Sequence, residues 1–185
     1  MPPFYTGNGD DGFTTLLGEE RYPKHASLFE ALGAVDEATA ALGVARCHVR
    51  PESTALLLQV QRHLQDVMAE IAATPEKGAN FQHIGSRQVS WLEEKIQAFE
   101  QETSMPGGFI VPGDDLPAAY LDVARTVVRR AERHAAGLLH EGGITHCDLL
   151  RYLNRLSSLC FLLEIYELRN APGSIPSMGN PEGEA

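Results

Sequence analysis

The sequence predicts an all-α protein, a bundle of five helices with a glycine-rich loop before the first helix and a flexible tail after the last. Three observations support this fold class. Apolar residues recur every three or four positions through most of the chain, clusters of Gly and Pro interrupt that period, and no segments alternate as paired strands would. Because each helix must bury its apolar stripe, five helices with mostly short connections predict a bundle around one core.

The chain begins with residues that are rich in Gly, Asp and Thr and show no helical period. Its run TGNGDDG, from Thr6 to Gly12, is typical of a loop. From Asn170 onward the chain is rich in Pro, Gly, Ser, Asn and Glu, a composition that favours a mobile tail. We therefore expect a single domain, divided into an N-terminal loop (1–25), a helical bundle (26–169) and a C-terminal tail (170–185).

The first helix is predicted from about Ala26 to about Val49, and Pro51 suits the first turn of the second helix. The apolar face of the first helix carries Leu28, Leu32, Val35 and Leu42. The stripe of the second helix consists of Leu56, Val60, Leu64, Val67 and Ile71. We expect Thr74-Pro75 and Gly78 to end the second helix.

The third helix is predicted from about Ser86 to the run MPGG at 105–108, and the apolar link FIVPG follows at 109–113. The fourth is predicted from about Leu116 to His140, where EGG at 141–143 closes it. The fifth is predicted from about Asp148 to Leu168. Its inward face carries Leu149, Leu153, Leu156, Cys160 and Leu163.

The composition excludes several classes of function. The 185 residues carry a formal net charge of −10, which argues against broad binding to nucleic acid or to an anionic membrane. The longest apolar run, Leu159 to Leu163, is too short to cross a bilayer. The first residues show no signal-peptide pattern, and the three cysteines form no CxxC, so we expect a cytoplasmic protein with reduced thiols.

Basic residues gather between positions 125 and 133, in the run RTVVRRAER. At about 100° per residue, Arg125, Arg129 and Glu132 share one narrow face of the predicted helix, and Arg133 lies next to it. Arginine suits phosphate because its planar fork donates paired hydrogen bonds. This face is therefore a candidate anion site in an acidic protein. The alternative is a solvated helix face with ion pairs between successive turns.

Two further segments are weaker candidates. Asn154 lies in the middle of the predicted fifth helix, where Asn has a propensity cost, so its side chain has either a ligand or an interhelical hydrogen bond. The loop from Gly9 to Thr15 offers N–H groups and hydroxyls to a phosphate chain, although it is neither a P-loop nor a GxGxxG turn. The seven histidines show no metal-ligand spacing, so we predict no metal held by protein side chains alone.

Three motifs occur in order along the chain. They are the loop from Tyr5 to Leu16, the stretch VDE at 35–37 leading to ALG at 41–43, and the pair RRAER at 129–133 with YLNRLS at 152–157. Together they resemble the PduO-type ATP:corrinoid adenosyltransferase family, over most of the chain from Tyr5 to about Glu167. The last pair is the most specific part, and FIVPG at 109–113 resembles the family's loop before the fourth helix.

The resemblance implies a cobalamin adenosyltransferase-like five-helix bundle that forms a homotrimer, with ATP bound between neighbouring subunits. It implies that the N-terminal loop wraps the triphosphate and that Lys24 contacts phosphate. The implied loop residues are Thr6, Gly9, Asp10, Gly12, Thr14 and Thr15. Arg129, Glu132 and Asn154 match the family's nucleotide-holding and catalytic positions, and Arg133 extends that set.

The resemblance also assigns roles outside the nucleotide site. Asp36 and Arg125 match an aspartate–arginine pair that bridges subunits, and Phe109 matches an aromatic residue that keeps the corrinoid's lower face free of an axial ligand. The implied reaction transfers the 5′-deoxyadenosyl group of ATP to reduced cobalt, with Lys24, Arg129 and Mg²⁺ stabilising the triphosphate that leaves. The implied partners are a corrinoid reductase and an adenosylcobalamin-dependent enzyme.

Four positions depart from the family's pattern. Gly7 stands where relatives carry a basic residue, Asp114 and Asp115 follow the loop where Gly-Gly is common, and Ser158 replaces an aspartate. We expect these departures to weaken substrate binding or to change the corrinoid preference. Two alternatives to the enzyme remain open: a non-catalytic corrinoid- or nucleotide-binding bundle, and a structural bundle whose arginines form only ion pairs.

Overall fold

The computed structural model describes residues 5–16, 20–73, 84–171 and 176–179. Within them, five helices form the predicted bundle: α1 (Ser27–Arg46), α2 (Pro51–Ile71), α3 (Ser86–Glu102), α4 (Leu116–His140) and α5 (Asp148–Asn170). The helix starts at 51, 86, 116 and 148 agree with the prediction, whereas α1 ends before Val49 because the chain turns at 47–49. The break expected at 74–78 lies outside the described residues, as do 172–175 and 180–185 of the tail.

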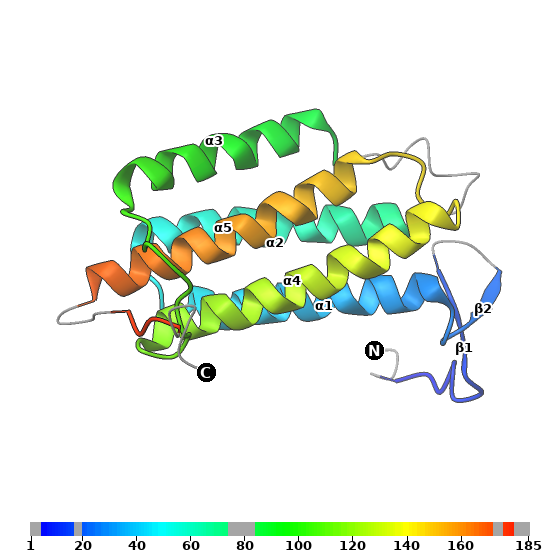
Figure 1. The fold of residues 1–185 in the computed structure, drawn as a ribbon. Helices are drawn as coiled ribbons and strands as arrows, with labels where there is room; N and C mark the ends of the chain where they lie inside the picture. Colours follow the sequence, from blue (N-terminus) through cyan, green and yellow to red (C-terminus); the bar gives the residue numbers. More distant parts are fainter. Residues whose placement is uncertain (1–4, 17–19, 74–83, 172–175, 180–185) are drawn as a thin grey trace, which may run out of the picture.

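The helices pack around α4, which lies against both α1 and α5 (Figure 1). α2 packs on α1 and α3 packs on α5. Both α1 and α4 bury small side chains: Ala31, Ala34 and Ala38 on α1 and Ala124, Ala131 and Ala135 on α4. Small residues let the two helices approach closely. No helix in the described part of the chain is long and apolar enough to cross a membrane.

The N-terminal segment contains a short β-hairpin that the sequence did not predict. Strands β1 (Phe13–Thr15) and β2 (Arg21–Pro23) pair antiparallel, with Thr14 opposite Tyr22. The prediction that no strands pair was therefore wrong at these residues, and Thr14 and Thr15 lie in a strand. Strands of three residues are too short to show a readable period of two. The hairpin is held by Arg21, whose Nη2 donates to both carboxylate oxygens of Asp11 and whose guanidinium lies over the Phe13 ring.

The loop between α3 and α4 is tied at two points by the aspartates that depart from the family's pattern. Asp115 caps α4, accepting a hydrogen bond from the Ala118 amide at 3.4 Å. Asp114 accepts from the amide and the hydroxyl of Ser177, at 2.6 and 2.9 Å. Two backbone hydrogen bonds of 2.8 Å also join residues 109–111 to 177–179. The loop that carries Phe109 is thus fixed both to α4 and to the C-terminal segment.

Candidate functional site

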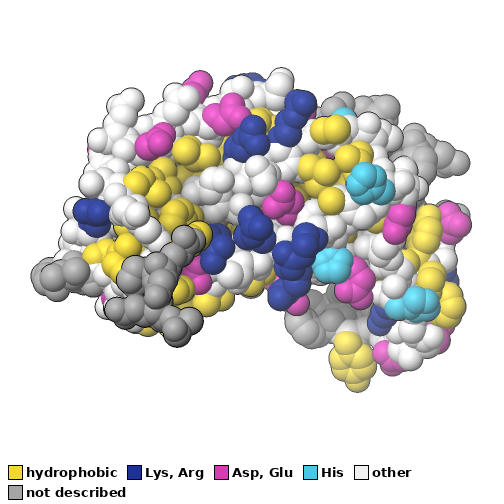
Figure 2. Space-filling view, viewed as in Figure 1, with side chains coloured by type: hydrophobic (Ala, Val, Ile, Leu, Met, Phe, Trp, Pro, Cys, Tyr) yellow, Lys and Arg dark blue, Asp and Glu magenta, His cyan; other side chains and the backbone are white. Residues whose placement is uncertain are grey.

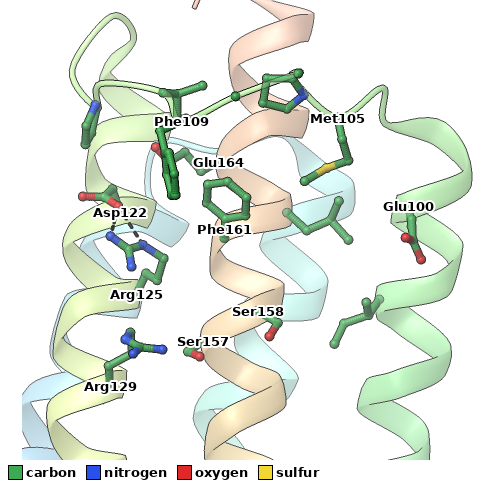
Figure 3. A pocket seen from close by; sticks show the side chains of 17 residues that line it. Glu100, Met105, Phe109, Asp122, Arg125, Arg129, Ser157, Ser158, Phe161 and Glu164 are labelled. Carbon is green, nitrogen blue, oxygen red and sulfur yellow. Dashed lines mark hydrogen bonds and ion pairs between the residues drawn. The ribbon is translucent and has the colours of Figure 1, made fainter. Parts of the chain in front are cut away.

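A pocket of about 870 Å³ opens between α3, α4, α5 and the loop at 105–112 (Figure 3). Apolar side chains make much of its wall, including Ile96 on α3 and Phe161 and Leu162 on α5. Its polar lining comes chiefly from α4 and α5: Asp122, Arg125, Arg129, Ser157, Ser158 and Glu164. A mostly apolar cavity of this size with a few polar groups suits an organic ligand.

Phe109 lies at the mouth of this pocket. Its side chain is 92% exposed, and Figure 3 shows its ring near that of Phe161. The backbone behind the ring is fixed, because the Phe109 carbonyl accepts from the Gly179 amide at 2.8 Å. An exposed aromatic ring on a tethered loop offers a flat apolar face to a ligand. The residue predicted to contact the corrinoid therefore lies where a ligand would enter.

Two of the predicted arginines line the same pocket, one turn apart on α4. Arg125 forms a close ion pair with Asp122, its Nη2 lying 2.7 Å from Oδ1. Arg129 is exposed, and its guanidinium forms no ion pair among the described residues. Figure 2 shows dark blue side chains gathered near the middle of this face of the molecule. The pocket thus has one cation already neutralised by a neighbour and one available to an anion.

Glu132 and Asn154 do not line this pocket but bond to each other beside it. Asn154 Nδ2 donates to Glu132 Oε1 at 2.9 Å, joining α5 to α4. Arg155 donates through Nη1 to Asn154 Oδ1 at 3.1 Å and through Nε to Glu93 Oε1 on α3 at 3.1 Å. The four side chains form a chain of hydrogen bonds across three helices, which fixes the orientation of the Asn154 amide. Asn154 therefore makes the interhelical hydrogen bond that one interpretation expects, and its partner Glu132 belongs to the candidate nucleotide site that the other interpretation expects.

Several residues of this site were not assigned from the sequence. Arg155 directly follows Asn154 within the YLNRLS motif, and this position could have identified it as a site residue. No feature of the sequence points to Glu93, Asp122 or Glu164. Glu164 is buried, and burial together with the nearby Asp122 carboxylate raises its pKa to about 7, although Arg125 acts in the opposite direction. The predicted Arg133 is exposed and donates to the Arg129 carbonyl at 3.1 Å, so it extends the basic face along α4.

The N-terminal loop forms a second hollow, of about 560 Å³. It is lined by residues 7–11, 13–15 and Arg21, which include the predicted Gly9, Asp10, Thr14 and Thr15. Gly12 lies outside the lining but bends the loop, with a φ of 82°. The predicted Thr6 also lies outside it, where its Oγ1 accepts from the Asn8 amide at 3.2 Å. Arg21 was not predicted, and its hydrogen bonds lower the pKa of Asp11, which stays ionised beside the hollow.

Lys24 lies directly against this loop. A Cβ on Gly9 would fall 3.1 Å from Lys24 Nζ and 3.0 Å from the Phe13 carbonyl oxygen, and Gly9 has a φ of 101°. Only glycine adopts that conformation readily and leaves that space. The Lys24 backbone is also bound to the loop, because its amide donates to the Gly12 carbonyl at 2.9 Å. Gly9 and Lys24 are thus positioned as a unit, with the ammonium group beside the loop backbone.

The two hollows share no lining residue, and the hairpin and the Phe109 loop lie toward opposite ends of α4 (Figure 1). The predicted pair of Asp36 and Arg125 is also not formed within one chain. Asp36 is exposed on α1, and Arg125 is paired with Asp122. The described residues of one chain therefore do not bring the N-terminal loop and the α4 arginines into one hollow.

No group of three or more His, Cys, Asp or Glu side chains is placed to hold a metal in the described part of the chain. Mg²⁺ usually binds nucleotide phosphates with only one or two carboxylates, so an ATP-borne Mg²⁺ does not need such a group. Asp10 lines the hollow of the loop and is exposed. Its carboxylate fits a role beside such an ion.

Comparison with known proteins gives consistent matches. Residues 4–167 match the family described as cobalamin adenosyltransferase. The corrinoid adenosyltransferase of Bacillus subtilis is 36% identical over 162 residues, covering 85% of this chain and 82% of that protein. The corrinoid adenosyltransferase PduO of Citrobacter freundii is 37% identical over 161 residues, which cover 86% of this chain and 48% of the relative, so the chain spans about half of that longer protein.

Solved structures agree. A variant of the PduO-type ATP:corrinoid adenosyltransferase from Lactobacillus reuteri, complexed with cobalamin and ATP, superposes with a TM-score of 0.80 at 32% identity. The match covers 89% of this chain and 92% of that one. Another variant of the same enzyme, complexed with ATP, gives a TM-score of 0.78, also at 32% identity.

Proposed function

The chain belongs to the cobalamin adenosyltransferase family, and we propose on that basis that it transfers the 5′-deoxyadenosyl group of ATP to the cobalt of a reduced corrinoid. One observation carries this proposal. A single pocket joins an exposed aromatic ring, Phe109, to an arginine without an ion-pair partner in the described chain, Arg129. The reaction needs an apolar surface to bind the large corrinoid ring and a positive charge to bind the triphosphate of ATP.

The corrinoid occupies the Phe109 pocket in this mechanism. Its flat ring lies against the apolar wall, and the Phe109 ring covers the lower face of the cobalt, so that no axial ligand binds there. Without that ligand the cobalt is more easily reduced to Co(I), a strong nucleophile. An electron pair of Co(I) attacks the 5′ carbon of ATP and becomes the Co–C bond, while the C5′–O bond breaks and triphosphate leaves with the electron pair of that bond.

The protein's part is to position ATP and to stabilise the leaving group. Arg129 faces the triphosphate from α4, and Glu132, held by Asn154, accepts hydrogen bonds from the nucleotide. Lys24 and the N–H groups of the glycine-rich loop enclose the phosphates. Mg²⁺ bound to ATP supplies further positive charge when present. No step transfers a proton to or from the protein, so the site needs no general base.

We propose further that the active unit is a homotrimer, in which the loop of one subunit meets α4 of its neighbour. The separation of the two hollows within one chain supports this arrangement, as does the exposed Asp36, which is free to meet Arg125 of another subunit. If so, Asp36→Asn should weaken turnover more than it destabilises the subunit. A stable monomer with full activity in light scattering would contradict the trimer and the shared site.

We place the protein in the cytoplasm, where ATP is made and where a corrinoid reductase can supply reduced cobalt and an adenosylcobalamin-dependent enzyme can take the product. The direct test is an anaerobic assay with ATP, Mg²⁺ and chemically reduced cobalamin. We expect the absorption spectrum of adenosylcobalamin and one inorganic triphosphate per turnover. Binding of ATP and cobalamin without Co–C bond formation would instead indicate a non-catalytic binding protein, and no binding of ATP would indicate a structural bundle.

A further inference from the structure

Glu164 is an exception among the buried polar side chains of the described chain. Five polar or charged residues are buried there, and the other four (Ser53, Thr103, Ser157 and Glu167) have side-chain hydrogen bonds. Glu164 is 1% exposed, and its buried Oε2 atom has no hydrogen-bond partner among the described residues. Burying a polar group without a partner costs free energy, so such a group in a native protein needs an explanation.

The position of Glu164 suggests that explanation. Its side chain lines the pocket whose mouth carries Phe109, and Figure 3 draws it at the Phe109 end of that pocket. Glu164 lies within α5, so the helix fixes the position of its backbone. The carboxyl group therefore has no hydrogen-bond partner among the described residues, and the residue borders a space of about 870 Å³ in which a ligand can supply one.

The charged groups around Glu164 come from three helices. Asp122 and Arg125 on α4 face it, and Cys160 lies one turn earlier on α5 as a fully buried thiol. Glu100 on α3 and Arg129 on α4 line the same pocket. Arg125 is already bound to Asp122 at 2.7 Å, so it does not neutralise Glu164 as a dedicated partner would.

The balance of these surroundings favours a neutral carboxyl group. Burial and the Asp122 carboxylate raise the pKa of Glu164 to about 7, so a large fraction of the molecules carry it protonated near neutral pH. A protonated carboxyl group has one O–H donor and one carbonyl acceptor. This pair of groups is complementary to a primary carboxamide, which has a carbonyl acceptor and N–H donors.

We propose that Glu164 is a specificity residue for the corrinoid, pairing through its protonated carboxyl group with a carboxamide on the rim of the corrinoid ring. The inference rests on the proposed function, since it assigns the corrinoid to the Phe109 pocket. Cobalamin carries several primary carboxamides on its rim, whereas early corrinoid precursors carry free carboxylates. A carboxylate at this point would face Asp122 and Glu164 together, so the pocket selects amidated corrinoids.

The test compares two substitutions. Glu164→Gln keeps a donor and an acceptor but does not titrate, and Glu164→Leu has neither. The probe is cob(II)alamin in the presence of ATP, and the measured quantity is its Kd at pH 6 and pH 8.5. We expect wild-type affinity to fall about tenfold between these values, which is the size of one such hydrogen bond. Glu164→Gln should bind at both pH values about as tightly as the wild type does at pH 6.

We expect Glu164→Leu to bind about tenfold more weakly than the wild type at pH 6, without dependence on pH. Glu94→Gln, an exposed glutamate on α3 outside the pocket lining, is the matched control and should keep the wild-type profile. The KM for ATP should be unchanged in all variants. Competition by cobyrinic acid, whose side chains are carboxylates, should be weak against the wild type and stronger against Glu164→Leu.

Two outcomes would overturn this inference without affecting the proposed function. One is a Kd of Glu164→Leu for cob(II)alamin equal to that of the wild type at both pH values, and the other is a Kd of Glu164→Gln that changes with pH as that of the wild type does. Either could occur with normal adenosylation, so neither affects the proposed function. If the wild-type protein fails to bind cob(II)alamin, the proposed function and this inference fail together. If Glu164→Leu does not fold, the inference is still tested by the pH dependence of the Kd of Glu164→Gln and by the preference of the wild type between cobalamin and cobyrinic acid.

Discussion

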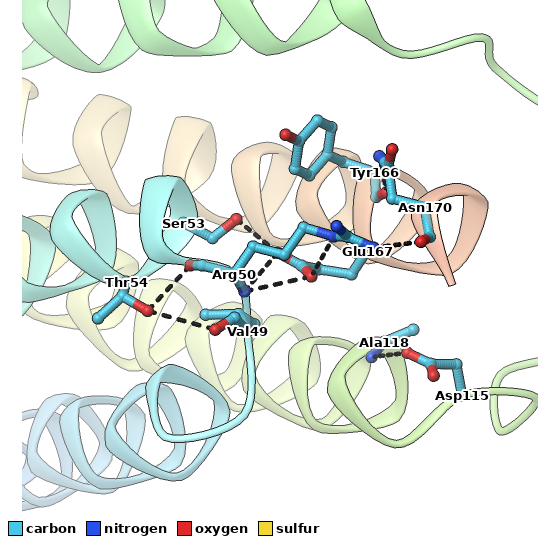
Figure 4. Close-up of polar contacts among 9 residues, drawn as sticks. All are labelled: Val49, Arg50, Ser53, Thr54, Asp115, Ala118, Tyr166, Glu167 and Asn170. Atoms are coloured by element: carbon cyan, nitrogen blue, oxygen red, sulfur yellow. Dashed lines mark hydrogen bonds and ion pairs between the residues drawn. The ribbon is translucent and has the colours of Figure 1, made fainter. Parts of the chain in front are cut away.

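Two glutamates, three positions apart on α5, are buried in different ways. Glu167 is 4% exposed and is well satisfied: it accepts from the Ser53 hydroxyl at 2.6 Å and from the Arg50 amide at 3.2 Å, with the Arg50 guanidinium 3.6 Å away (Figure 4). Glu164 is 1% exposed and has an oxygen, Oε2, with no hydrogen-bond partner in the part of the chain that the structure describes. The contrast indicates two roles for a buried carboxylate. One with a complete set of hydrogen bonds joins elements of the fold, whereas one that faces a pocket and lacks hydrogen bonds is available to a ligand.

The same contrast occurs on α4 between adjacent arginines. Arg130 forms an ion pair with Glu37 on α1, so its charge is used within the chain. Arg129 lines the Phe109 pocket and has no ion pair among the described residues. Arg130 therefore joins α4 to α1, whereas Arg129 faces the candidate site with its charge unpaired among the described residues. Four predictions sharpen or break this division.

The largest effect is expected from Arg129. Arg129→Ala should lower kcat/KM for ATP by about 30- to 1000-fold, equivalent to about 2–4 kcal/mol, because a charge that faces the leaving triphosphate is lost. Arg130→Ala is the matched control and should lower activity less than about threefold, since exposed ion pairs contribute little. Steady-state kinetics with reduced cobalamin measure both. Similar losses in the two variants would mean that the pocket face of α4 is not the nucleotide site.

The next prediction concerns stability and uses the same substitution at both glutamates. Glu167→Leu should lower the free energy of unfolding by about 2–3 kcal/mol, because the Ser53 hydroxyl and the Arg50 amide lose their partner. Glu164→Leu should cost nothing or stabilise slightly at pH 8, because it replaces a buried carboxylate that lacks a full set of hydrogen bonds. Urea denaturation followed by circular dichroism compares them. A larger loss in Glu164→Leu would reverse the two roles.

A smaller effect follows from the titration of Glu164. Its pKa is about 7 in the folded protein and near the ordinary 4.5 when unfolded. Between these values the folded state binds more protons, so the free energy of unfolding falls as pH rises from 4.5 through 7. We expect this residue to contribute a decrease on the order of 1–2 kcal/mol, reduced by water that enters the pocket. Glu164→Gln should lack this part of the decrease, and an unchanged slope against pH would refute the assignment.

The sequence predicted the helices well because their apolar stripes span several turns. Leu56 to Ile71 on α2, for example, repeats its step often enough to be unambiguous, and most of these residues are fully buried. The hairpin at 13–23 escaped prediction because its pairing depends on Arg21 contacting Asp11 and Phe13, and such contacts leave no period in the sequence.

The site was predictable only in part. Arg125 and Arg129 share a face by helical geometry, and they do line one pocket. Glu132 was expected on that same face, but its partner is Asn154 on another helix, and the angle around one helix does not reveal such a contact. Glu164 could not be found from sequence, since a single glutamate among apolar residues shows neither the pocket beside it nor Asp122 opposite. Its role depends on packing between helices rather than on any pattern within one.

The smallest expected effects separate the two aspartates before α4. Asp115→Ala should lower the free energy of unfolding by about 0.5–1 kcal/mol, because the first turn of α4 loses its capping oxygen, and should leave corrinoid use unchanged. Asp114→Ala should leave stability unchanged, because Asp114 lies in an exposed loop, but should raise the KM for corrinoid about two- to threefold. The reason is that its two hydrogen bonds to Ser177 hold residues 176–179 against the loop that carries Phe109. The sequence comparison suggested the opposite, that an added carboxylate here weakens binding. Ser177→Ala distinguishes the two: it should raise the KM as Asp114→Ala does if the tether matters, and a lower KM in Asp114→Ala alone would show that the charge of Asp114 opposes corrinoid binding.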